Sequence, residues 1–338
     1  MKKKVVRWIF WILVLCSLLL GTILFSLCTG SVGISLKEIL RVILEGKDTI
    51  EHSILFDIRL PRIILGFAIG GALSLTGVVL QGMFRNPLVE PYTLGISGGA
   101  AIGVCLNIVF HLNRALGILS LPVSGFLGAL CVVVLVYLLS VKKGVLKIQD
   151  LLLTGVMISF ISSSLIMFIM AVSRTEDLHG IVFWIMGSLE EPNNALILIS
   201  LFISVAGLTA SFLFCKDLNA LALGEEEAMH LGVNVERSKR FLFIIASVLT
   251  GFSVSVAGII GFVGLVIPHF MRMLVGRDHR ILLVSSFLGG AAFLIVCDTL
   301  ARTIIAPIEL PVGVITGLVG GSVFVYVLTR KQISLKGK

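Results

Sequence analysis

The amino-acid sequence predicts an all-α polytopic membrane protein, a single transmembrane domain over residues 1–338 with about ten membrane-spanning helices in two inverted halves of five. Hydrophobic residues make up 57% of the chain, charged residues only 14%, and the mean hydropathy is +1.09. Soluble domains have about a quarter of their residues charged. The apolar runs reach the roughly 20 residues that a helix needs to cross a bilayer, and the period-2 alternation of a membrane barrel is absent.

Charged residues, glycines and prolines mark the limits of the spans. The first run follows Lys2, Lys3 and Lys4, and it is longer than a signal-peptide core and lacks a small-residue cleavage site, so we expect a retained helix. The seventh and eighth runs are continuous but too long for one crossing, and we place a reversal at Gly258 to Gly261. The expected spans are residues 8–28, 63–84, 94–112, 118–141, 151–172, 194–215, 241–260, 261–275, 281–300 and 311–329.

The distribution of basic residues predicts the orientation, because cytoplasmic loops hold the excess of lysine and arginine. With both termini in the cytoplasm, all but eight of the 27 basic residues lie on the inner side. An odd number of spans in each half makes the halves inverted, and Gly77 and Gly258 are each followed ten residues later by a proline. The eight outer basic residues are Lys37, Arg41, Lys47, Arg59, Arg62, Arg114, Arg174 and Arg302.

Three outer arginines, Arg59, Arg62 and Arg302, lie at or near the ends of spans. Arg59 and Arg62 also stand at a helix N-terminus, where the helix dipole disfavours positive charge by up to about 1 kcal/mol. One interpretation is local pairing, with Asp57 beside Arg59 and Asp298 four residues before Arg302. The other is a docking site for carboxylates of an external partner.

Two further segments are candidates for function. The longest inner segment, residues 216–240, is predicted to form a short helix that ends at Gly232 and a basic lead into the next span; a solvated loop is the alternative. The fifth span carries hydroxyl and thioether side chains that would suit a passage for a large, partly apolar solute, although such residues equally serve helix packing. The path candidates are Ser159, Ser162, Ser163, Met167 and Met170.

Other chemistries find less support in the sequence. There is no intramembrane carboxylate cluster of the kind expected in an ion-coupled transporter, no phosphate-binding loop, and no cysteine pair that indicates a disulfide or a metal site. Gly95 to Gly99 fits a serine-nucleophile motif, so an intramembrane protease with Ser97 and His269 is an alternative. Glycines at positions 95, 99 and 103 are, however, typical of close helix packing.

Four motifs occur in order along the chain: Arg59 to Arg62, Gly77 to Ser97, Gly261 to His269, and Glu309 to Gly313. Together they resemble the permease subunits of type II ABC importers for iron-siderophores, haem and vitamin B12, the FecCD/BtuC family. The resemblance implies a BtuC-like subunit that pairs with an identical or related permease around a central path. Two cytoplasmic ATPase subunits would bind ATP and Mg²⁺, and an external binding protein would deliver the substrate.

The resemblance also implies residue roles. The family's docking arginines match Arg59, Arg62 and Arg302. The inner gate would lie at Ile148 and Gln149, where the family has small hydroxyl residues. The segment that rests on the ATPase would contain Leu221, Gly224, Glu225, Glu226, Glu227, Ala228 and Gly232.

The expected function is therefore import of a metal chelate, a ferric siderophore in the first place and haem or cobalamin as alternatives, across a bacterial cell membrane. We expect the chain to do no bond chemistry, to bind no cofactor, metal or nucleic acid itself, and to leave ATP hydrolysis to its partners.

Overall fold

The computed structural model describes residues 2–45, 49–112, 117, 119–142 and 144–336. Residue 118, where the fourth span was expected to begin, and the outer basic residues Lys47 and Arg114 lie outside these ranges. Within them, seven helices are long and apolar enough to cross a membrane, and three shorter apolar helices cover 96–109, 263–275 and 312–327. These ten helices coincide with the ten expected spans, which confirms the predicted fold class.

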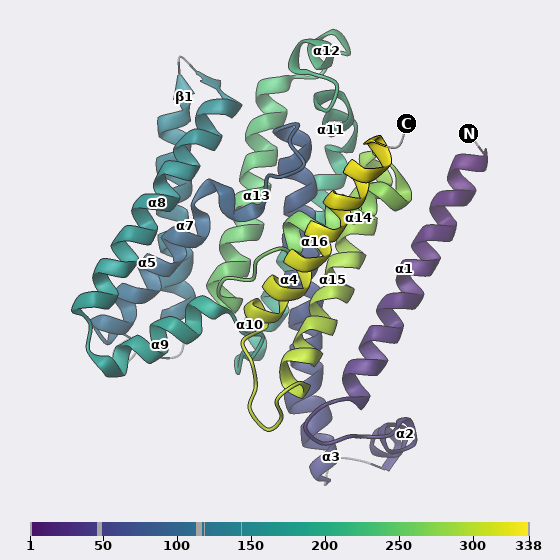
Figure 1. The fold of residues 1–338 in the computed structure, drawn as a ribbon, viewed down its shortest axis with the longest axis vertical. Coiled ribbons are helices and arrows are strands. Elements are labelled where there is room, and N and C mark those ends of the chain that lie inside the picture. Colours follow the sequence, from purple (N-terminus) through teal and green to yellow (C-terminus); the bar gives the residue numbers. More distant parts are fainter. Residues whose placement is uncertain (1, 46–48, 113–116, 118, 143, 337–338) are drawn as a thin grey trace.

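The ten helices divide into two sets of five with opposite directions. The first set is α1 (Lys2–Cys28), α4 (Leu60–Met83), α5 (Ile96–Val109), α7 (Ser120–Ser140) and α8 (Ile148–Val172). The second is α10 (Asn194–Leu213), α13 (Val235–Ala257), α14 (Val263–Val275), α15 (His279–Thr303) and α16 (Val312–Lys336). In Figure 1, α1 runs away from the end that holds both termini, whereas α10 runs toward it.

Short elements connect the spans at the two ends of the bundle. At the lower end in Figure 1 lie α2 (Leu36–Glu45), α3 (Ile50–Ser53) and α9 (Thr175–Met186), and the π-helix η1 (Ile54–Arg59) leads from α3 into α4. At the upper end lie α11 (Cys215–Leu221) and α12 (Glu225–His230). The antiparallel strands β1 (Val141–Lys142) and β2 (Val145–Leu146) pair Val141 with Leu146, and a 3₁₀ turn, η2 (Pro91–Leu94), precedes α5.

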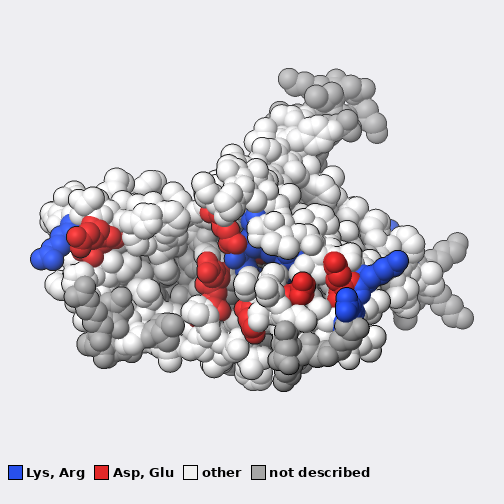
Figure 2. All heavy atoms as spheres, turned by 90° about the horizontal axis from the view of Figure 1, so that it is seen from below, with Lys and Arg blue, Asp and Glu red and all other residues white. Residues whose placement is uncertain are grey.

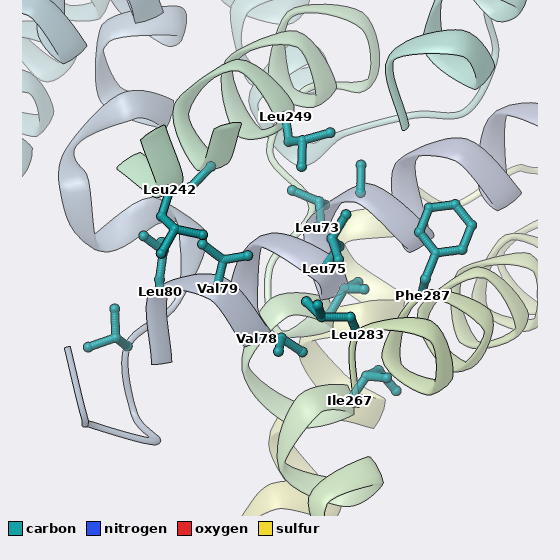
Figure 3. Packing of buried hydrophobic residues seen from close by; sticks show 14 of the residues in the cluster. Leu73, Leu75, Val78, Val79, Leu80, Leu242, Leu249, Ile267, Leu283 and Phe287 are labelled. Carbon is teal, nitrogen blue, oxygen red and sulfur yellow. The ribbon is translucent and has the colours of Figure 1, made fainter. Parts of the chain in front are cut away.

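The core is built around α4, which is surrounded by other helices along most of its length. Figure 3 shows Leu73 of α4 beside Leu249 of α13, and Val78 of α4 beside Leu283 of α15 and Ile267 of α14. Lipid tails are as apolar as leucine, so close packing rather than water exclusion must hold these helices together. Glycines permit that closeness: a Cβ added at Gly70 would lie 2.4 Å from the backbone oxygen of Gly290 on α15.

The predicted reversal between the seventh and eighth spans is present. Helix α13 ends at Ala257, Gly258 adopts φ 69°, and α14 starts at Val263. The connection is held from the first half of the chain, because the Tyr92 hydroxyl donates to the Ile260 carbonyl at 2.8 Å and accepts its N–H at 3.0 Å. Glycine at 258 therefore supplies the left-handed backbone that the turn requires.

Candidate functional site

The three outer arginines meet at the lower end of the bundle, but their side chains are turned into the protein. Arg59, Arg62 and Arg302 are only 2%, 7% and 5% exposed. They come from the last residue of η1, the first turn of α4 and the last turn of α15. A charge buried among apolar helices is costly unless it is paired, so their partners decide what these residues do.

Asp298 is shared by two of the arginines. Arg62 donates to Oδ1 of Asp298 from Nη2 at 3.0 Å and from Nε at 3.3 Å. Arg302, one helical turn after Asp298, donates from Nε to Oδ2 at 3.0 Å. One carboxylate thus accepts from two guanidiniums that come from different halves of the chain. The local pairing expected for Arg302 and Asp298 is confirmed.

The remaining donors of the cluster bind other elements. Arg62 Nη1 lies 2.7 Å from Glu309 in the loop before α16, and Arg302 Nη2 donates to the Ser26 hydroxyl of α1 at 3.0 Å. Arg59 donates to the backbone carbonyls of Leu27 and Val32. The expected pairing of Arg59 with Asp57 is wrong, because the Arg59 guanidinium reaches across to the end of α1 instead.

The expectation of arginines presented at the outer surface needs correction in the same way. The carboxylate of Asp298 and the carbonyls at and after the end of α1 satisfy these guanidiniums internally, and the exposed charges beside them are carboxylates, Glu309 and Glu190 among them. A cavity of about 520 Å³ opens here, with Arg62, Glu190 and Glu309 on its wall. Figure 2 shows the result from below: basic atoms lie deep in the centre and acidic atoms surround them. Whether Arg62 contacts a partner stays a prediction.

The path candidates on α8 divide between two faces. Ser163 and Met167 are exposed and Ser159 is half-buried, and their four-residue spacing places them on one stripe. Ser162 is buried and packs against Gly98 of α5, and Met170 packs into a cluster with α5 and α9. Ser162 thus serves the packing of α8 against α5 in this structure, and its place on a path stays a prediction.

The inner segment forms two short helices at the upper end. Leu221 and Ala228 are buried and fix α11 and α12 to the bundle, while Glu226 and Glu227 are exposed. Gly224 precedes α12 with φ 150°, and Gly232 follows it with φ 83°. Three apolar side chains on this segment point to solvent: Leu223, Met229 and Leu231. The segment is thus an ordered surface with an apolar centre, not a solvated loop.

A buried lysine, which the sequence analysis did not single out, joins this surface to its neighbours. Lys239 of α13 is 1% exposed, and its ammonium group has three acceptors. These are Glu225 of α12 at 3.1 Å, Glu236 of α13 at 2.7 Å and the carbonyl of Leu146 in β2 at 2.8 Å. Glu236 also accepts the Leu146 N–H at 2.9 Å. The spacing of Glu236 and Lys239, one helical turn apart, was the only signal in the sequence.

The gate candidates follow directly after this hairpin. Ile148 and Gln149 form the first turn of α8, with Ile148 packed on the main core and Gln149 exposed. Lys142 of β1 lies 2.7 Å from Asp150 in the same turn, which ties the hairpin to the helix. Through Leu146, the hairpin connects the gate candidates to Lys239.

We predict that Asp298→Asn destabilises the protein by about 3–5 kcal/mol, because two buried guanidiniums lose their shared counter-charge. The measurement is the midpoint of unfolding in detergent micelles. Glu309→Gln is the matched control: it removes the exposed partner of the same arginine and should cost no more than about 1 kcal/mol. Equal losses in the two variants would contradict the central role of Asp298.

Comparison with known proteins assigns the chain to a family. The model of the FecCD transport family matches residues 18–330. The hemin transport system permease protein HmuU of Yersinia pestis is 40% identical over 83% of this chain and 84% of its own. The Fe(3+) dicitrate transport system permease protein FecD of Escherichia coli is 35% identical over 93% and 96%.

A solved structure supports the same assignment. It is described as an inward-facing conformation of a metal-chelate type ABC transporter, and it matches with a TM-score of 0.82 and 33% identity over 95% of this chain and 99% of that one. The likeness therefore covers the helices and their order over nearly the whole chain. The chain belongs to the FecCD transport family.

Proposed function

We propose that this chain is the membrane permease of an ATP-driven importer and that its cargo is a ferric siderophore. Membership of the FecCD transport family places the chain among ABC transporter permeases, with ATP hydrolysis on a separate subunit, so a protease reaction at Ser97 and His269 is set aside. The observation that carries the cargo proposal is the mixed stripe on α8. Haem is the second candidate because of the 40% identity to a hemin permease.

The α8 stripe supports a path for a chelate. Its hydroxyl and thioether groups offer weak hydrogen bonds and adaptable apolar contacts, and no fixed charge, to a solute that is partly apolar and partly polar. Ser163 and Met167 are exposed in a single chain, so a second permease, identical or related, would enclose the path. The gate would lie at the inner end of the same helix, at Ile148 and Gln149.

Arg62 would contact the binding protein by exchanging its partner Glu309 for a carboxylate of that protein. Its Nη1 is held by Glu309, whose side chain is 46% exposed on the wall of the outer cavity. A carboxylate of an external binding protein would replace Glu309 there, while Asp298 keeps the arginine in place. Arg59 and Arg302, which are held by backbone and by buried groups, would position the docking surface rather than touch the partner.

The α11–α12 surface is suited to receive an ATPase subunit. Exposed apolar side chains surrounded by polar ones are typical of the centre of a protein interface. Movement of α12 would reach the β1–β2 hairpin through Glu225 and Lys239. Two ATPase subunits with ATP and Mg²⁺ would act at this end. Both termini lie at the same end in Figure 1 and would then be in the cytoplasm of a bacterial cell, with the arginine cluster outside.

The proposal predicts ATP-dependent uptake of a ferric siderophore into vesicles that hold the permease, its ATPase and its binding protein. Because the cargo is delivered by the binding protein, ATP hydrolysis should rise only when protein and chelate are both present. The assay compares a ferric siderophore, hemin and cobalamin at equal concentration. If hemin is the only one of the three that stimulates ATP hydrolysis, the cargo is haem and not a ferric siderophore. Uptake that follows an ion gradient without nucleotide would contradict ATP-driven import.

The same assay tests docking. In Glu309→Gln the Nη1 of Arg62 loses its charged partner and is more easily taken by an incoming carboxylate, so half-maximal stimulation should need less binding protein. A requirement for more binding protein would show that Glu309, and not Arg62, makes the contact.

The inner surface gives a separate prediction. Leu231→Lys places a charge in the apolar centre of the α11–α12 surface and should weaken ATPase binding at least about tenfold, as expected for an interface centre. Co-purification of the ATPase with the tagged permease measures the effect. Ile308→Lys is the control, since both side chains are 65% exposed but Ile308 lies at the opposite end. Equal ATPase recovery in the two variants would refute the assignment.

A further inference from the structure

A second charged cavity lies at the upper end of the bundle, away from the α8 stripe and beside the α11–α12 surface, whose Ala222 is part of its wall. It has a volume of about 450 Å³ and opens between the ends of α4 and α14 and the start of α15. Three arginines line it, Arg85, Arg272 and Arg277, together with Gln81 and His279. No carboxylate is among the described residues on its wall.

The ends of α4 and α14 bring these three arginines together. Arg85 follows α4 in the left-handed conformation, with φ 51°. Gly276, with φ 94°, ends α14 and is followed by Arg277. Arg272 lies in the last turn of α14 and donates from Nη2 to Oε1 of Gln81 at 3.1 Å.

Gln81 is oriented by a proline. Pro268 lacks an N–H and leaves the carbonyl of Gly264 without its helical donor. The Gln81 amide nitrogen donates to that carbonyl and to the carbonyl of Val89, both at 3.3 Å. Its oxygen must therefore face Arg272, and the guanidinium is held at the cavity wall.

No carboxylate among the described residues forms an ion pair with the arginines of this cavity. Among the described residues, the bond from Arg272 to Gln81 is the only hydrogen bond shown for the three guanidiniums, and none of them has an ion pair. The nearby Asp278 is already engaged: Arg280 at 2.7 Å, Lys4 at 2.9 Å and Asn219 at 3.2 Å hold its pKa well below the usual range. The C-terminal dipoles of α4 and α14 favour cations here, but they are partial charges and do not replace a carboxylate.

One buried acceptor completes the wall. The amide nitrogen of Asn219 donates to Asp278, so the amide oxygen of Asn219 faces His279. That oxygen lies 2.9 Å from Nδ1 and also accepts the His279 N–H at 2.9 Å. Nδ1 therefore carries the proton, and Nε2 is a bare acceptor. His279 is 4% exposed, and its Nε2 has no partner in the described part of the chain.

We propose that this cavity binds a phosphate oxyanion that also carries a hydroxyl donor. The guanidiniums would take the anionic oxygens in charge-assisted hydrogen bonds, and the hydroxyl would donate to Nε2 of His279. Two sources offer this chemistry: the phosphodiester and hydroxyls of a phosphatidylglycerol head group, and free hydrogen phosphate. The cavity lies at the ends of membrane helices, the depth at which basic pockets meet lipid head groups. The inference does not depend on the transported cargo.

The test uses the full-length chain in nanodiscs of phosphatidylcholine, of phosphatidylcholine with phosphatidylglycerol, and of phosphatidylcholine with inorganic phosphate, with chloride keeping the ionic strength equal. Thermal unfolding and native mass spectrometry report binding. A higher unfolding midpoint only in the phosphatidylglycerol sample would identify the lipid as the ligand. A rise only in the phosphate sample would identify the free anion, and a rise in each of the two samples would show that the site accepts either. No rise above the chloride reference in either arm would overturn the proposal.

Variants locate the site. Arg85→Gln with Arg277→Gln should weaken the binding at least about tenfold, because each charge-assisted hydrogen bond contributes about 1.5–3 kcal/mol and 1.4 kcal/mol is a factor of ten. Both side chains are exposed and lack partners in the described structure, so the fold should survive. The control, Lys216→Gln with Arg237→Gln, removes equal charge from exposed positions at the same end but outside the cavity. An equal loss in the control would contradict a specific site.

Discussion

The structure depends on pairing the charges that its helices bury. Asp298 lies between Arg62 and Arg302, and all three side chains are less than a tenth exposed. Removing one member of such a group leaves an uncompensated charge and typically costs about 3–5 kcal/mol, a large part of the stability of a protein. The cluster also reaches α1 through Ser26 and the loop before α16 through Glu309. The two halves of the chain are thus joined by charge at one end and by close glycine packing along α4 and α15.

At the opposite end of the bundle the buried charge is that of Lys239, and it is also paired. Its three acceptors belong to α12, α13 and β2, so the buried ammonium group joins a surface segment to the hairpin that starts α8. Hydrogen bonds in a buried network strengthen one another, so these three bonds hold α12, α13 and β2 together more firmly than an exposed loop would be held. The outer cluster holds elements fixed, and the inner cluster connects elements that, in our proposal, move together.

The sequence predicted the helices well and the side-chain partners poorly. Apolar length sets the ten spans, and the glycine at 258 marks the reversal, because both depend on local chemistry. The partners of Arg62 and Arg302 outside their own helices are 236 to 276 residues away, so no local pattern reveals them. Ser162 shows the same limit: the hydroxyl pattern identifies a polar helix, but only the neighbouring α5 decides which hydroxyls are buried. The i, i+4 pair of Asp298 and Arg302 was the exception.

The most direct test of the account is the amount of cargo moved per ATP in Glu225→Gln, which removes the negative charge that α12 presents to Lys239 and leaves Glu236 in place. Glu226→Gln, an exposed neighbour on the same helix, is the control. If Lys239 connects the ATPase surface to α8, Glu225→Gln should keep its ATPase and its hydrolysis but move several-fold less cargo per ATP, while Glu226→Gln stays at the wild-type ratio. An unchanged ratio in Glu225→Gln would contradict the proposed connection.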